Sequence, residues 1–271
     1  MAKIRELLKS EINLLQNFPP ENWNLDLPFF VSFHFDYSYF YPIVAEEEDQ
    51  IVGFGNGILN DKTGWLGNIL VPSEFRRRGI GHEITKHLIE YFKSKGCKSQ
   101  ILIASDMGKN IYSRLGFRES STYEFLKINS DLPKYPENKN IRRINDNDFD
   151  LLKEFDEEIT GEKRFSFIKR YFPTGWLYQQ KKSNNIQGVF LPDLGSGLIF
   201  ANFPEIGLEL IKFKLNLGKI RTVIPSENET ALNFLKSQGF EISTKAPRMV
   251  LGYEVNWKPE NVYNRATGYC G

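Results

Sequence analysis

The residues with the clearest potential for chemistry form a basic, glycine-rich run between a strand-like and a helical segment. The run reads Val71-Pro72-Ser73-Glu74-Phe75-Arg76-Arg77-Arg78-Gly79-Ile80-Gly81. Gly79 and Gly81 lack β-carbons, so the backbone there can approach a bulky anion closely. Free N–H groups at the start of the following helix would point at that anion, and the arginines would add charge-assisted donors. The pattern predicts a phosphate-binding site. The alternative is a solvated basic turn before an ordinary helix.

Two other phosphate-binding patterns fit less well. The chain has no Gly-x-x-x-x-Gly-Lys-Ser/Thr loop. The Gly-x-Gly-x-x-Gly pattern of dinucleotide-binding folds fails because Ile84 stands where the third glycine would be. Neither a nucleoside triphosphate nor a dinucleotide is therefore the expected ligand.

A second informative run follows the next strand-like segment. It reads Leu102-Ile103-Ala104-Ser105-Asp106-Met107-Gly108-Lys109-Asn110-Ile111-Tyr112-Ser113-Arg114-Leu115-Gly116-Phe117. This run and Arg76-x-x-Gly79-x-Gly81 resemble the two signatures of the GNAT superfamily of acetyl-CoA-dependent N-acetyltransferases. The second run departs from the common signature at Ser105, where many members carry Asn, and at Gly108, where many carry Ala. A bacterial subgroup with Gly at that position also has a second, GNAT-like domain. The chain resembles that subgroup over nearly its whole length, more loosely in the second half.

The resemblance implies a role for each matching position. The implied cofactor-binding residues at the pyrophosphate are contiguous: Arg76, Arg77, Arg78, Gly79, Ile80 and Gly81. Ser105 is a further implied cofactor-binding residue. Leu70 and Val71 would offer backbone groups to the pantetheine arm and the thioester carbonyl, in a gap where strand 65–71 splays from strand 99–104. Tyr112 would donate a proton or a hydrogen bond to the departing CoA thiolate while an amine attacks the thioester. The alternative for Tyr112 is a core aromatic on a short helix.

The base that takes the amine proton is not identified by any pattern. His34, Asp36 and the acidic run 46–48 are candidates, but each is better explained as a structural or surface residue, and water can relay the proton instead. His82 and His87 lie five residues apart on the expected helix, a poor spacing for shared metal binding. No metal is predicted.

The elements that must position these residues follow a mixed α/β order. We expect helices over 3–16, 79–95 and 107–115, and strands over 41–45, 51–59, 65–71, 99–104 and 117–126. The stretch 29–41 holds eight aromatics and is ambiguous between helix and strand. It suits the core or, as the resemblance implies, the border of the acceptor site.

The same order returns after residues 129–140, whose Pro, Asn and Lys content predicts a linker. We expect helices over 149–159, 164–171, 206–217 and 230–238, with strands between them and after Phe240. Gln238-Gly239-Phe240 matches Leu115-Gly116-Phe117 as a helix-Gly-Phe end, which suggests a tandem duplication. The predicted fold class is α/β, an α+β mixed sheet, with two tandem GNAT-like domains at 1–128 and 141–256. Each would have a central, mostly antiparallel sheet flanked by helices, and residues 257–271 would form a tail.

The second half keeps this order without the chemistry. Residues 202–207 contain no arginine, and Leu235, at the place of Tyr112, has no proton to give. We interpret this half as a degenerate copy that does not turn over acetyl-CoA and walls one side of the acceptor pocket. The tail either covers the second sheet or packs over the pocket as a lid, and the first is favoured.

Composition restricts the partners. A net charge of +1 gives no electrostatic case for nucleic acid or an anionic membrane. No apolar run approaches the ~20 residues needed to cross a bilayer, and the N-terminus lacks the apolar core of a signal peptide. Cys97 and Cys270 lie far apart without metal-ligand spacing, so a reduced, cytoplasmic protein is expected, with a disulfide as the alternative.

The predicted function is transfer of an acetyl group from acetyl-CoA, as co-substrate, to a primary amine in a ternary complex. The acceptor would be a small-molecule or peptide amine, and an oligomer is compatible with the sequence. A non-catalytic acetyl-CoA-binding sensor is the alternative from another class. A pure interaction protein would bind no CoA, which the intact arginine-glycine run argues against.

Overall fold

The computed structural model describes residues 2–20, 23, 25–129, 131–180 and 185–270. Ser130 of the expected linker and Gly271 of the tail lie outside the described residues. The rest of the linker, 129 and 131–140, contains neither helix nor strand, and Tyr135 ties it to the second half by a hydrogen bond to Gln238 (2.8 Å).

The first sheet is mixed and mostly antiparallel, with the strand order β1-β2-β3-β4-β5-β12-β6-β11. Its strands are β1 (Lys3–Glu6), β2 (Phe40–Glu47), β3 (Gln50–Asn60), β4 (Thr63–Leu70), β5 (Ser99–Ile103), β6 (Arg118–Lys127), β11 (Thr222–Pro225) and β12 (Glu241–Gly252). Only the neighbours β4 and β5 run parallel. The helical segments of this half are η1 (Lys9–Leu15), α1 (Leu27–His34), η3 (Ser73–Phe75), α2 (Ile80–Ser94) and α3 (Asp106–Arg114).

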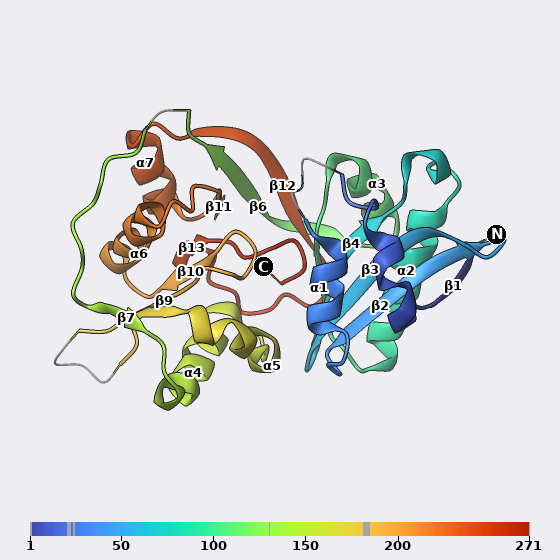
Figure 1. Ribbon diagram of the computed structural model, residues 1–271, viewed down its shortest axis with the longest axis horizontal. Helices are drawn as coiled ribbons and strands as arrows, with labels where there is room; N and C mark the ends of the chain where they lie inside the picture. The colour runs from blue at the N-terminus through green and yellow to red at the C-terminus, as the bar shows by residue number, and fades with distance from the viewer. Residues whose placement is uncertain (1, 21–22, 24, 130, 181–184, 271) are drawn as a thin grey trace.

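Helix α2 covers one face of this sheet at close range. Its packing depends on glycines that alternate along β3, because successive side chains of a strand point to opposite faces. A β-carbon at Gly53 would lie 2.8 Å from Ile84, and one at Gly57 would lie 2.7 Å from Phe92. The opposite face is covered by α1 and by the second half of the chain (Figure 1).

The helix expected over 3–16 is wrong in its first part. Lys3–Glu6 forms β1, with Ile4 opposite Ala45 of β2, and a helical turn begins only at Lys9. Arg5 forms ion pairs with Glu46 on β2 and with Glu11. Tertiary pairing of this kind outweighs the weak helical propensity of four residues.

The second sheet is antiparallel, with the order β13-β10-β9-β8-β7. Its strands are β7 (Ile141–Arg143), β8 (Trp176–Tyr178), β9 (Gly188–Leu191), β10 (Leu198–Ala201) and β13 (Val262–Asn264). Its helical segments are η4 (Asp146–Asp148), α4 (Phe149–Thr160), α5 (Phe165–Ile168), η5 (Lys169–Thr174), α6 (Pro204–Asn216), α7 (Glu229–Ser237) and η6 (Pro259–Asn261).

Strands from the second half complete the first sheet. β12 lies between β5 and β6, and β11 pairs with the other side of β6. In Figure 1, β6 and β12 run side by side from one half to the other, and the C-terminus lies between the halves. The tail does more than cover the second sheet: β13 joins that sheet, and Tyr269 packs against β4 so closely that a β-carbon at Gly67 would collide with it.

Candidate functional site

The strands β4 and β5 diverge, as the family resemblance implies. Their parallel pairing ends at Trp65 opposite Ile101, although β4 continues to Leu70. β4 also carries one extra residue relative to β3, and Asn68 there has a φ of 48°. A gap therefore opens beyond Trp65. Because α2 and α3 follow the carboxyl ends of these parallel strands, both helix N-termini lie at this edge of the sheet.

The turn into α2 leaves helix N–H groups without a side-chain cap. Gly79, at the N-cap position, has a φ of 84°, and Arg77 has a φ of 62°. The first N–H groups of an α-helix have no partner inside the helix. At α2 these groups are open to an anion, which the helix dipole favours at this end.

The three arginines of the turn are exposed but differ in their contacts. Arg76 donates a hydrogen bond from Nε to the Val71 carbonyl (2.9 Å), so that carbonyl is already occupied. Arg78 forms an ion pair with Glu47. Arg77 forms no ion pair with any described residue, which leaves its guanidinium the most available of the three for an external anion.

Gly81 faces open space. A β-carbon built there would have one near neighbour among the described residues, Val71 Cγ2 at 3.8 Å, an ordinary van der Waals distance. Packing within the chain therefore does not require glycine at this position. Close approach of a ligand to the first turn of α2 would require it.

Tyr112 lies on α3 and folds back over Gly108. A β-carbon at Gly108 would be 2.6 Å from Tyr112 Cε2, so glycine at this place makes room for the ring. Ser105 caps the helix, its Oγ accepting a hydrogen bond from the Gly108 N–H (3.3 Å). Tyr112 packs on the same apolar cluster as Ile80 at the start of α2. Burial raises the pKa of the phenol to about 12, so it is protonated at neutral pH.

His34, a candidate base, is engaged in the core. It is fully buried at the end of α1, and its ring nitrogens lie 3.0 Å from the hydroxyls of Tyr39 and Tyr171. Burial lowers the pKa of His34 to about 3, which makes it a weak base. The aromatic stretch around it is helix α1 followed by β2, and most of its rings pack in the core.

The acidic candidates form ion pairs elsewhere. Asp36 pairs with Lys9 (2.7 Å), and Glu46 pairs with Arg5. Glu47 is the partner of Arg78. These contacts assign structural roles to the carboxylates concerned.

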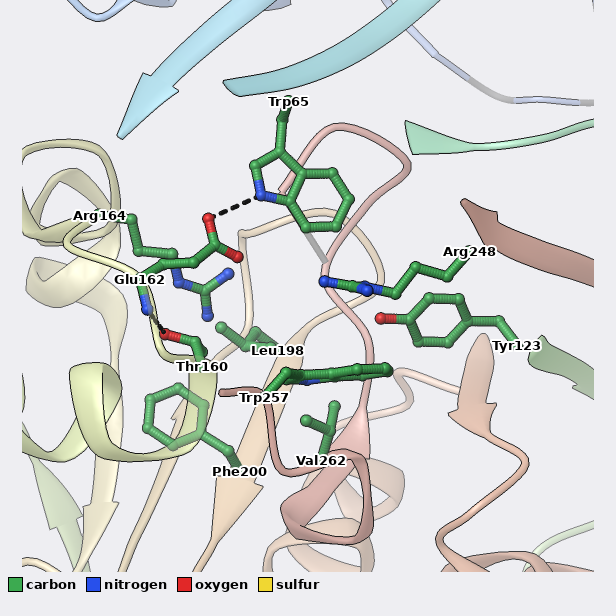
Figure 2. Close-up of a pocket in the computed structure, with 10 residues that line it drawn as sticks. All are labelled: Trp65, Tyr123, Thr160, Glu162, Arg164, Leu198, Phe200, Arg248, Trp257 and Val262. Atoms are coloured by element: carbon green, nitrogen blue, oxygen red, sulfur yellow. Dashed lines mark hydrogen bonds between the residues drawn. The ribbon is translucent and has the colours of Figure 1, made fainter. Parts of the chain in front are cut away.

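A pocket that sequence reasoning missed lies between the two halves (Figure 2). Its lining comes from β4, β6, β10, β12, β13, the end of α4 and the segments after α4 and β12: Trp65, Tyr123, Thr160, Glu162, Arg164, Leu198, Phe200, Arg248, Trp257 and Val262. Except for half-buried Trp257, every one of these side chains is buried. The one signal in the sequence was a group of charged residues, 162–164, between the apolar residues Ile159 and Phe165. Amphipathic patterning assigns such charged residues to the surface.

The charged groups of the pocket are held by specific partners. Trp65 Nε1 donates to Glu162 Oε2 (2.8 Å), which also accepts from Asn60 (3.3 Å). Burial raises the pKa of the Glu162 carboxyl. The Arg248 guanidinium lies 4.5 Å from the ring centroid of Trp257, a cation–π distance.

The matching place in the second half is filled by the chain itself. α6 follows β10 as α2 follows β4, but β13 pairs with β10 there, and Asn264 Oδ1 accepts from the Val223 N–H of β11 (2.8 Å). The Tyr263 ring lies against Gly207 near the start of α6, where a β-carbon would collide with it. In the second half, the tail thus fills the place that corresponds to the gap between β4 and β5 in the first half.

Other site types find little support in the described part of the chain. No group of three His, Cys, Asp or Glu residues is arranged there to hold a metal ion. Within the same residues, no helix has the length and apolarity to cross a membrane. Cys97 and Cys270 are free thiols.

Known structures share this architecture. The crystal structure of a candidate acetyltransferase from Pyrococcus horikoshii is 22% identical and has a TM-score of 0.83, over 100% of this chain and 96% of that one. A GCN5-related N-acetyltransferase from Sphaerobacter thermophilus is 14% identical, with a TM-score of 0.62 over 93% and 95% of the two chains. A third, from Anabaena variabilis, is 13% identical, with a TM-score of 0.58 over 92% of this chain and 72% of that chain. At these identities the likeness establishes the fold.

Sequence comparison points to the same region as the geometry. No curated protein matches the chain significantly. Residues 8–117 match the model of the acetyltransferase (GNAT) family, and this range contains the diverging strands, the arginine-glycine turn and Tyr112. Residues 8–117 are therefore similar to the acetyltransferase (GNAT) family, within a two-part fold that the chain shares over 93% of its length with a GCN5-related N-acetyltransferase.

Proposed function

We propose that this chain transfers the acetyl group of acetyl-CoA directly to a primary amine, with both substrates bound at once. The observation that carries the proposal is the gap between β4 and β5, which leads to the uncapped N-terminus of α2. In this proposal the first turn of α2, at Ile80 and Gly81, and the arginines before it hold the pyrophosphate, and Leu70 and Val71 border the pantetheine arm.

Contacts at the turn support a division of labour among the arginines. Arg76 braces the loop through the Val71 carbonyl, and Arg78 is already paired with Glu47. Arg77 is therefore the main charge for the phosphate oxygens, with the backbone N–H groups of α2. Ser105 caps α3, so any contact it makes with the cofactor is additional to that role.

The proposed reaction forms a C–N bond and breaks the C–S bond of the thioester. The amine nitrogen attacks the acetyl carbonyl, the CoA thiolate departs, and the nitrogen loses a proton to a base. A thiol has a pKa of about 8.5, well below that of the Tyr112 phenol at about 12. Tyr112 would therefore stabilise the thiolate by donating a hydrogen bond rather than by giving up its proton.

The second half would serve as an accessory unit without a cofactor site. β13 and Tyr263 fill the place that matches the β4–β5 gap, and no arginine precedes α6 in the segment 202–207. We propose a division into a catalytic domain (1–128), a linker (129–140), an accessory domain (141–256) and a tail (257–271). Strands β11 and β12 of the accessory domain belong to the sheet of the catalytic domain.

Calorimetric titration with acetyl-CoA tests the proposal. We expect one site per chain in the wild type and no binding by Gly81→Glu, because a carboxylate in the open space beside α2 would meet the phosphates. Lys86→Glu, at an exposed position of the same helix, is the matched control and should keep binding. Two equivalent sites would show that the second half binds the cofactor. Absence of binding would refute acetyl transfer, and binding without CoA release in the presence of amines would indicate a sensor.

A further inference from the structure

We propose that the buried pocket between the two halves is the acceptor site, and that its acceptor is a small amine that also carries a carboxylate. This inference rests on the proposed acetyl transfer and specifies the chemical class of the second substrate. The pocket is closed by buried side chains of both halves, which excludes an amine held on a protein surface. Its free space is about that of one water molecule, so the acceptor must be small and the lining side chains must move apart to admit it.

The position of Trp65 places the pocket at the apex of the β4–β5 gap. Trp65 is the last residue of β4 that pairs with β5, opposite Ile101. Its neighbour Gly64 faces Phe92 of α2, so the Trp65 side chain lies on the other face of the sheet. A pantetheine arm that follows the gap from α2 would bring its thioester to this apex from one side, and the pocket adjoins it from the other.

Glu162 is suited to the amine. Its Oε2 accepts hydrogen bonds from Trp65 and Asn60, whereas its Oε1 accepts none from the described residues and is directed into the pocket in Figure 2. The Trp65 and Trp257 rings already have a cation beside them, because the Arg248 guanidinium lies 5.7 and 4.5 Å from their centroids. The ammonium would therefore be held by Glu162. Glu162 can bind the ammonium form and accept one proton from it, a role for which its raised pKa is appropriate, so that the free amine attacks the thioester. The second proton, which the nitrogen loses as the amide forms and the CoA thiolate departs, goes to water.

Arg248 and Tyr123 are suited to the carboxylate. Arg248 is 2% exposed, and its contacts with acceptors are the Ser120 hydroxyl (2.8 Å) and the carboxylate of Glu254 (3.6 Å), both through Nη1. The Tyr123 hydroxyl points into the pocket beside this guanidinium and has no hydrogen-bond partner among the described residues (Figure 2). A substrate carboxylate would supply the acceptors that these buried donors lack.

One buried arginine next to the pocket has donors without partners in the described part of the chain. Arg265 lies 5.0 Å from the Tyr123 ring centroid, and its Nε and Nη1 have no hydrogen-bond partner among the described residues. The other two buried arginines have carboxylate partners, because Asp156 pairs with Arg164 (2.9 Å) and Glu254 lies 3.6 Å from Arg248. A bound carboxylate would add a negative charge beside the unpaired Arg265, whose burial is otherwise costly.

Matched pairs of acceptors test the inference without any variant. Each amino acid is compared with the amine that lacks only its carboxylate: glycine with methylamine, alanine with ethylamine, serine with ethanolamine. CoA release gives kcat/KM for each. We expect the amino acid to exceed its partner by about 10- to 100-fold, the effect of one charge-assisted hydrogen-bonded pair.

Arg248→Gln should remove that preference by lowering kcat/KM for the amino acid to the level of the amine, with acetyl-CoA affinity unchanged. Arg118→Gln is the matched control, because Arg118 pairs with the same Glu254 (2.6 Å) but is exposed and does not line the pocket. Thermal melting verifies that both variants fold. If Arg248→Gln does not fold, the wild-type pairs decide the question.

Direct binding separates this inference from the proposed function. Two of the four tryptophans line the pocket, so the amino acid should change the intrinsic fluorescence and its decarboxylated partner should not. Equal use of both members of each pair, or no fluorescence response to any amino acid, would overturn the inference while acetyl transfer stood. A fluorescence response in a protein that does not bind acetyl-CoA would refute the proposed function and leave the carboxylate site in place.

Discussion

Replacing Tyr112 with phenylalanine removes one hydroxyl and leaves a ring that still packs over Gly108 and near Phe117. The phenol pKa of about 12 exceeds that of a thiol by about 3.5 units, so full proton transfer to a free thiolate would be uphill by about 5 kcal/mol. The hydroxyl therefore acts as a hydrogen-bond donor to charged sulfur, an interaction of about 1.5–3 kcal/mol. Its loss should lower kcat by about 10- to 150-fold and leave KM for acetyl-CoA nearly unchanged.

The pH profile and the leaving group distinguish this role from a structural one. Because burial keeps the phenol protonated, Tyr112 should cause no fall in wild-type kcat between pH 7 and 10, and Tyr112→Phe should show the same profile at a lower level. An acetyl thioester of a more acidic thiol should restore much of the lost rate in Tyr112→Phe, since a better leaving group needs less stabilisation. Tyr91→Phe, on a ring stacked against Tyr41, is the control and should keep full activity. An unchanged kcat in Tyr112→Phe would make this tyrosine a core residue and refute the reasoning.

Three other substitutions test the packing in both halves. Gly108→Ala would place a β-carbon 2.6 Å from the Tyr112 ring, so kcat should fall about tenfold as the ring moves, with acetyl-CoA binding kept in calorimetry; full activity would contradict this. Gly207→Ala would collide with Tyr263 and should cost about 1–3 kcal/mol in urea unfolding, without weakening acetyl-CoA binding. A loss of binding would place the cofactor in the second half. Burial lowers the pKa of Lys214 from 10.5 to about 7. Between these values the unfolded chain binds a proton that the folded chain does not, so stability should rise with pH. Lys214→Met should flatten this rise between pH 7 and 9, and equal slopes in urea unfolding would contradict the assignment.

The elements that frame the proposed cofactor site were predictable because their signals are local. Pro72 ends the pairing of β4, Gly79 starts α2, and the apolar period of the following residues defines the helix. The divergence of β4 and β5 was expected from the family resemblance, and it is seen in the structure, where the two strands pair only as far as Trp65 and Ile101. The turn also holds features that composition does not show, above all that Arg76 and Arg78 are already engaged while Arg77 is not.

The pocket was not predictable because its residues meet only through long-range pairing. Trp65, Glu162 and Arg248 come from three distant segments. Periodicity assigns charged residues to the surface, since burying one is costly unless a partner compensates it, and such partners are invisible in a local window. The same limit hid β1 and β13, short strands that exist through pairing with β2 and β10.

The exchange of strands explains why the second half, which we propose has no cofactor site, is inseparable from the first. β12 lies between β5 and β6, with Arg248 opposite Ile103 on one side and Ser121 on the other. Removing it would expose two strand edges in the middle of a sheet, which natural proteins avoid. The register in which β12 pairs with β5 and β6 also positions the Arg248 guanidinium beside Trp257. One set of backbone hydrogen bonds thus holds the sheet beside the β4–β5 gap and sets the charge of the pocket, so a shift between the halves would disturb both.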